Sequence, residues 1–123
     1  MYALLLMSHM GLAVLALLLT LGWAGFVVAG STGPGQLSRP VYIGAMASTG
    51  LVGVTGVILA FAGGFATMAF PWIGLLAVAG HGFAGARSRR FLAAGRQGAA
   101  TAAAALQVAL LLVAYGVMTA KPF

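Results

Sequence analysis

The sequence predicts an all-α integral membrane protein, a four-helix bundle with short loops. Its high hydrophobic content, its low charge and its four long apolar runs predict this fold class. Of the 123 residues, 63% are hydrophobic and only 5% are charged, whereas soluble domains carry roughly 25% charged residues. The apolar residues fall into four long runs separated by glycine, proline and arginine. A soluble fold of this length cannot bury so much apolar surface, so we expect residues 1–123 to form a single transmembrane domain.

The four expected helices cover about residues 2–29, 41–62, 70–86 and 98–119. The first run reaches about 42 Å as a helix, which exceeds the hydrocarbon core and predicts a tilt or a projecting end. The segment 30–40 is rich in glycine and proline and reads as a loop, as does the shorter glycine-containing turn at 63–67. Pro71 suits the first turn of the third helix, because no N–H is needed there. The third helix looks short, and the alternative is that it extends into the arginine-rich segment that follows it.

Positive charge gathers in two of the three expected loops. The first loop carries Arg39, the second carries no cation, and the third carries four arginines, Arg87, Arg89, Arg90 and Arg96. The positive-inside rule therefore places loops 30–40 and 87–97 in the cytoplasm and both termini in the periplasm, with only Lys121 opposing. High alanine and glycine content, with arginine preferred over lysine, favours a bacterial chain. We expect a multi-pass protein of the bacterial inner membrane.

The same basic loop indicates what the chain contacts outside the bilayer core. Arginines beside membrane segments attract anionic lipid headgroups. Phe91 is the only aromatic residue in this loop, so a nucleic acid is not an expected partner. The expected partners are the bilayer, anionic headgroups, and other membrane subunits or further copies of this chain.

The chain contains no aspartate, no glutamate and no cysteine. Without carboxylates it cannot form the acid pair of a glycosidase, a Ser-His-Asp triad or a carboxylate metal cage. Without thiolates it cannot form a zinc ribbon, an iron–sulfur site or a cysteine nucleophile. We expect no metal site, and we do not expect an enzyme.

Two histidines, His9 and His81, are the titratable side chains inside the expected spans. Polar groups in a bilayer are costly and usually face the bundle interior. If the first and third helices are neighbours, the two imidazoles lie at similar depths and one b-type haem between them is a hypothesis. The competing interpretation is that each histidine hydrogen-bonds across a helix contact.

Small and polar residues predict where the helices touch. Gly50, Gly53 and Gly56 recur in the second helix, and glycines let helix backbones approach closely in lipid. Gln107 lies mid-helix and is expected to hydrogen-bond across an interface. Five aromatic residues near the ends of the spans are expected to be interfacial anchors: Tyr2, Trp23, Tyr42, Trp72 and Tyr115. Three hydroxyl residues in the second helix are expected to bond their own helix backbone: Ser48, Thr49 and Thr55.

Several segments together resemble the SirB family of small bacterial four-helix membrane proteins. They are His9 early in the first helix, Gly56-Val57-Ile58-Leu59-Ala60, Phe70-Pro71-Trp72, Arg87-Ser88-Arg89-Arg90, and the C-terminal Ala114-Tyr115-Gly116-Val117-Met118-Thr119-Ala120-Lys121-Pro122. The resemblance covers about half of the chain and implies four helices in the orientation given above. The family's His-Asp pair in the second helix and its lysine in the third are absent here. The resemblance implies no catalytic residue.

The leading functional hypothesis is a non-catalytic subunit or assembly factor of a larger bacterial membrane complex, in respiratory or photosynthetic electron transport. The loops are too short for a substrate-binding domain, and the helices are rich in close-packing surfaces. The alternative is a haem b electron-transfer protein that uses His9 and His81. A second alternative is a small transporter or channel, which would need a polar pathway through the bundle.

Overall fold

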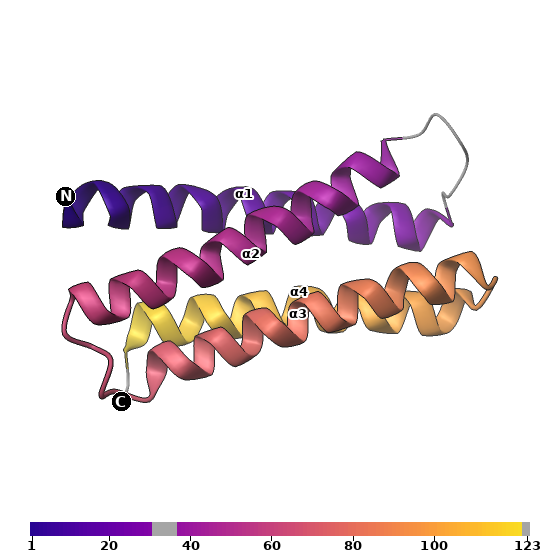
Figure 1. Cartoon of the computed structure of the whole chain (residues 1–123). Coiled ribbons are helices and arrows are strands. Elements are labelled where there is room, and N and C mark those ends of the chain that lie inside the picture. Colours follow the sequence, from indigo (N-terminus) through magenta and orange to yellow (C-terminus); the bar gives the residue numbers. More distant parts are fainter. Residues whose placement is uncertain (31–36, 122–123) are drawn as a thin grey trace.

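The structure is a computed structural model, and it describes residues 1–30 and 37–121. These residues form four helices and no strand: α1 (Tyr2–Ala29), α2 (Ser38–Ala62), α3 (Phe70–Ala93) and α4 (Gln97–Ala120) (Figure 1). The all-α, four-helix fold class is therefore confirmed. Three helices, α1, α2 and α4, are long and apolar enough to cross a membrane. The chain is accordingly a membrane protein.

The ends of α1 and α2 follow from local backbone chemistry. α1 ends at Gly30, whose φ of 70° is left-handed and whose N–H donates to the carbonyls of Phe26 and Val27. Glycine adopts this conformation without a Cβ clash. α2 begins at Ser38 rather than at residue 41. Pro40 then lies in the first turn, where its missing N–H leaves no hydrogen bond unmade.

The third helix is longer than predicted. α3 continues past residue 86 to Ala93. The prediction of a basic loop over residues 87–97 is therefore wrong, and only residues 94–96 connect α3 to α4. Arginine is a good helix former, and two of the guanidinium groups stack on rings. Arg87 lies 4.9 Å from the ring of Phe83, and Arg89 lies 5.0 Å from that of Tyr42. These contacts allow the helix to continue through the charged segment.

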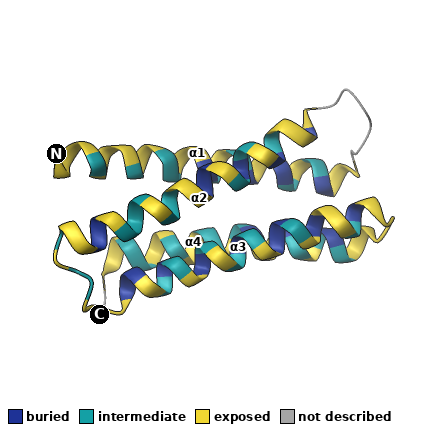
Figure 2. Ribbon diagram, viewed as in Figure 1, coloured by how far each residue is buried: buried dark blue, intermediate teal, exposed yellow. Residues whose placement is uncertain are grey.

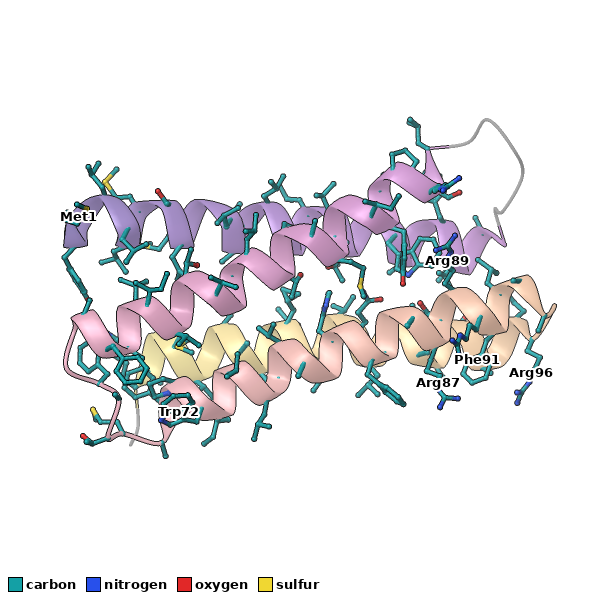
Figure 3. All side chains as sticks on the ribbon, in the orientation of Figure 1. Met1, Trp72, Arg87, Arg89, Phe91 and Arg96 are labelled. Carbon is teal, nitrogen blue, oxygen red and sulfur yellow. The ribbon has the colours of Figure 1, made fainter. Side chains whose placement is uncertain are left out.

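The helices form two hairpins that pack against each other. α1 packs most extensively on α2 and α3 on α4, while α1 with α4 and α2 with α3 join the hairpins. α1 and α3 lie diagonally across the bundle and contact each other at only a few residues. Neighbouring helices are antiparallel, so the N-terminus and the end of α4 lie together (Figure 1). We call this the terminal end. The opposite end, with Arg87, Arg89 and Arg96, is the arginine end (Figure 3).

The core lies toward the arginine end. The buried residues of α1 begin only at Ala16 and continue through Trp23 to Val27, whereas its first half is exposed or half-buried (Figure 2). The core cluster is Trp23, Val27, Tyr42, Leu92, Ala100 and Ala104. The prediction that Trp23 and Tyr42 are interfacial anchors is wrong, because their rings meet edge to face inside this core, with centroids 4.8 Å apart. The other three aromatics are exposed at the terminal end, as anchors would be: Tyr2, Trp72 and Tyr115.

Candidate functional site

A buried polar cluster joins three helices near the middle of the bundle. His81 of α3 is fully buried, and its Nε2 lies 3.0 Å from Thr20 Oγ1 of α1 and 3.3 Å from Gln107 Nε2 of α4. Thr20 and Gln107 are also fully buried. Because Thr20 bonds across the bundle diagonal, this cluster ties the α1–α2 hairpin to the α3–α4 hairpin. We call it the central cluster.

The hydrogen-bond roles in the central cluster follow from the donor groups. An amide NH2 can only donate, so with this group of Gln107 facing the ring, Nε2 of His81 is the acceptor. Nδ1 of His81 and Oε1 of Gln107 then have no partner among the residues that the structure describes. An unmade bond at a buried polar atom costs about 1–3 kcal/mol. The cluster is therefore held by packing as well as by hydrogen bonds.

Gly85 makes room for the central cluster. A Cβ at this position would lie 2.7 Å from Gln107 Nε2 and 2.9 Å from Met46 Sδ. We expect Gly85→Ala to destabilise the bundle by about 1–3 kcal/mol, because Gln107 is enclosed and cannot move aside freely. An SDS titration in mixed micelles, followed by circular dichroism, measures this change. Gly50→Ala is the matched control and should change stability by no more than about 0.5 kcal/mol, since no atom lies within 4 Å of its added Cβ. Equal effects of the two variants would contradict this packing role.

Further side-chain bonds close the arginine end. Trp23 Nε1 of α1 donates to Ser88 Oγ of α3 at 2.9 Å, and Ser88 donates to the carbonyl of Gly85. Gln97, at the start of α4, donates to the carbonyl of Val27 near the end of α1 at 2.6 Å. These bonds, together with the central cluster, link α1 to both helices of the other hairpin. The arginine half of the bundle is thus fastened by polar contacts.

The second histidine lies in the other half of the molecule. His9 Nδ1 is 2.7 Å from Thr55 Oγ1 of α2, and Thr55 donates to the carbonyl of Leu51. Because the hydroxyl proton of Thr55 is used there, His9 Nδ1 donates and Thr55 accepts. Gly56 leaves space for the ring, since a Cβ there would lie 3.3 Å from His9 Cε1. His9 is only half-buried.

The structure does not bring His9 and His81 together. His81 is level with Thr20 on α1, and Thr20 follows His9 by 11 residues, which is about 16 Å along the helix axis. His9 instead bonds α2. One haem iron needs both imidazole nitrogens on the same atom, so a haem between these two histidines does not fit. The expectation of similar depths is wrong because the hairpins place the two residues in different layers.

An apolar crevice opens between the hairpins at the terminal end. Its volume is about 570 Å³. All four helices line it, and among its lining residues are His9, Thr49, Tyr115 and Lys121. His81 and Gln107 do not line it, so the crevice ends short of the central cluster. The sequence contained no direct signal for this crevice, because it results from how far the hairpins separate.

The predicted packing residues have different surroundings. Gly53 lies against α3, where an added Cβ would be 3.2 Å from Val78 Cγ1. Gly56 accommodates His9, and Gln107 bonds His81. Gly50 is exposed and has nothing within 4 Å of an added Cβ, so its expected packing contact is not made within the part of the chain that the structure describes.

The hydroxyl residues of α2 also differ from one another. Ser48 and Thr55 donate to carbonyls of their own helix as predicted, with bonds of 2.6 Å to Gly44 and 2.8 Å to Leu51. Thr49 does not, and its buried Oγ1 has no partner among the described residues. Sequence reasoning also missed Thr20. A lone hydroxyl inside the leucine-rich first helix was the available signal, because buried polar groups in lipid seek partners.

A shallow groove runs between α3 and α4 near the arginine end. Its volume is about 530 Å³, and its lining is Phe83, Ala84, Arg87, Phe91, Ala99, Ala102, Ala103 and Leu106. Two arginines lie over phenylalanine rings of this lining. The guanidinium of Arg87 is 4.9 Å from the centre of the Phe83 ring, and that of Arg96 is 4.7 Å from the centre of the Phe91 ring. Three alanines and Leu106 form the α4 side of the groove, and two phenylalanines, Ala84 and Arg87 form the α3 side.

No family model matches the chain, and no curated protein or solved structure matches it either. The resemblance to the SirB family therefore stays a prediction. The functional interpretation depends on the geometry of the four helices alone.

Proposed function

We propose that this chain is a non-catalytic subunit or assembly factor of a larger bacterial membrane complex, with respiratory and photosynthetic complexes as its setting. In this proposal the arginine end is cytoplasmic and the terminal end periplasmic. The observation that carries the proposal is the outer face of α4. This helix has only three buried residues, Ala100, Ala104 and Gln107, so most of its surface is left for other contacts.

The exposed face of α4 differs from a surface that only meets lipid. One stripe of exposed positions on it is mostly small, with Gly98, Ala102, Ala105, Ala109 and Gly116 interrupted by Leu112. Large exposed side chains lie beside this stripe, at Leu106, Val113 and Tyr115. Small residues allow a second helix to approach the backbone closely, and this packing drives helix association in membranes. The α4 face therefore fits a helix of another subunit.

The groove beside this face adds a charge requirement. Ala102 belongs both to the exposed face of α4 and to the groove that Arg87 lines. The chain has no aspartate or glutamate, so no side chain of its own can neutralise Arg87. A partner helix with an acidic residue at its cytoplasmic end would complement this arginine. The groove and the small-residue face together form one surface suited to a helix-in-groove contact.

The two alternatives receive less support from the geometry. The haem hypothesis required His9 and His81 to converge, and they lie in different layers. A transporter would need a polar pathway, yet His81 and Gln107 are fully buried and outside the crevice. Neither arrangement offers a route for an electron or an ion across the described part of the bundle.

The test is purification of the tagged protein from its native membrane in a mild detergent. We expect the wild type to elute in a large assembly with a reproducible partner subunit. Ala105→Phe should reduce the amount of co-purified partner roughly tenfold, because its ring would hold the partner helix away from α4. Ala79→Phe, at an exposed alanine on the outer face of α3, is the matched control and should retain the partner.

The outcomes separate the proposal from its competitors. A wild type that elutes as a monomer without a partner would contradict it. Equal retention by Ala105→Phe and Ala79→Phe would show that the partner binds elsewhere. Arg87→Gln should weaken the complex if a partner carboxylate pairs with this arginine, and adding salt should weaken the wild-type complex in the same direction.

A further inference from the structure

We propose that the crevice at the terminal end binds one anionic phospholipid, with its acyl chains between the two hairpins and its phosphate at Lys121. This inference concerns a different surface from the α4 face and does not depend on the proposed function.

The shape of the crevice matches part of a phospholipid. Its lining runs on α1 from Tyr2 to Leu17, a length of about 22 Å. One leaflet contributes about 15 Å of hydrocarbon, so the crevice spans the acyl region of a single leaflet and reaches its headgroup region. Its volume of about 570 Å³ lies within the range of roughly 300–1,000 Å³ that small-ligand pockets occupy.

An acyl chain is a narrower occupant than a protein helix, which with its side chains is at least about 10 Å wide. A flexible acyl chain is much thinner than a helix and can follow the space between Gly53 and Gly74, which both line the crevice.

The positive charge at the mouth of the crevice favours a lipid with an anionic headgroup. Lys121 lines the crevice and is the one Lys or Arg side chain at the terminal end, since all five arginines lie toward the other end. Its Nζ lies 5.1 Å from the ring of Phe65, another lining residue. No side-chain carboxylate exists anywhere in the chain to pair with it. A lipid phosphate at the mouth would give this lysine an anionic partner.

The lining of the crevice is mostly apolar, and no side chain there carries a charge besides Lys121. Thr119, one turn from Tyr115, adds a hydroxyl group close to Lys121. His9 and Thr49 line the crevice farther from its mouth. A mostly apolar lining with its one charge at the mouth is the pattern an amphiphile requires.

Native mass spectrometry of the purified protein tests this inference. The delipidated protein is mixed with phosphatidylglycerol or with phosphatidylcholine of the same acyl chains, and the bound lipids are counted after detergent removal in the gas phase. We expect one phosphatidylglycerol to persist on the wild type and phosphatidylcholine to be retained roughly tenfold less. Lys121→Gln should remove this preference, whereas Lys121→Arg should keep it.

A crevice-filling variant locates the bound lipid. Ala114 is a half-buried lining residue of α4, so Ala114→Phe should prevent retention of the lipid. Ala79→Phe, exposed on α3 and outside the crevice, should retain it. Arg96→Gln, at the arginine end, should also retain it, which separates the crevice from headgroups bound by the arginines.

Three results would overturn the inference. The first is equal retention of the two lipids by the wild type. The second is retention by Ala114→Phe at the level of Ala79→Phe. The third is a dimer in the same spectra that Ala114→Phe dissociates, which would show that a second copy of the chain fills the crevice instead.

Discussion

Trp23→Ala is expected to destabilise the bundle by about 3 kcal/mol, at the lower end of the range for buried tryptophans. Trp23 is only 3% exposed, packs edge to face on Tyr42, and donates to Ser88. In a membrane the separated helices still lie in lipid, so the hydrophobic transfer of the ring contributes little. The loss arises from the cavity and from missing van der Waals contacts at the closed end of the bundle. An SDS titration in mixed micelles, followed by circular dichroism, measures it.

Two variants control for the loss of a tryptophan as such. Trp23→Phe keeps most of the ring contact and removes only the bond to Ser88, so a cost of about 0.6–1.7 kcal/mol is expected. Trp72→Ala removes an exposed tryptophan whose Nε1 bonds the nearby carbonyl of Ala66, and about 1 kcal/mol or less is expected. If Trp72→Ala cost as much as Trp23→Ala, the core would not lie at the arginine end.

His81→Ala is expected to cost about 2–3 kcal/mol, the second-largest effect. The substitution leaves a cavity at a site with no exposure and removes the partner of both Thr20 and Gln107. The bond to Thr20 is one of two side-chain links between α1 and α3, the other being Trp23 to Ser88, so the two hairpins should separate more readily. The same SDS titration reports stability. Fluorescence energy transfer between a label on α1 and a label on α3 reports the separation. One cysteine introduced on each of these helices provides the labelling sites, because the chain has no cysteine of its own.

The matched control is the other histidine. His9→Ala removes a half-buried ring with one interhelical bond, to Thr55 within the same hairpin, so about 0.6 kcal/mol is expected. A double-mutant cycle of His81→Ala with Gln107→Leu should show coupling, since the two side chains touch. Additive effects, or a His9→Ala cost equal to that of His81→Ala, would contradict the central cluster as a link between the hairpins.

Most of the helical framework was predictable because it depends on local properties of the chain. The first helix matches its predicted range, and α4 differs from its range by one residue at each end. The error in α3 has a physical origin: charge was taken as the end of the helix, but Arg87 and Arg89 keep helical backbone and stack on rings. The second of those rings belongs to Tyr42 on another helix, so only tertiary contact provides it.

The candidate site was much less predictable. His9 and His81 were singled out from the sequence as polar groups, but their separation depends on which helices are neighbours and how the hairpins pack. Thr20 was not singled out, although it bonds His81 across the bundle. Gly50 and Gly53 look alike in sequence, yet one is exposed and the other lies against Val78. Residue spacing cannot tell which face of a helix meets a neighbour when apolar residues surround it.

The sequence by itself determined that this chain is a bundle of apolar helices with its arginines gathered toward one end. Hydropathy, helix breakers and charge placement act locally, and the bilayer demands helices from any such chain. Only the tertiary structure decided that the arginine half is closed by buried polar bonds while the terminal half opens as an apolar crevice. The reason is that no hydrophobic effect drives helices together in lipid. A few buried side chains, such as His81 and Trp23, therefore determine where the two hairpins are in contact and where they are separated.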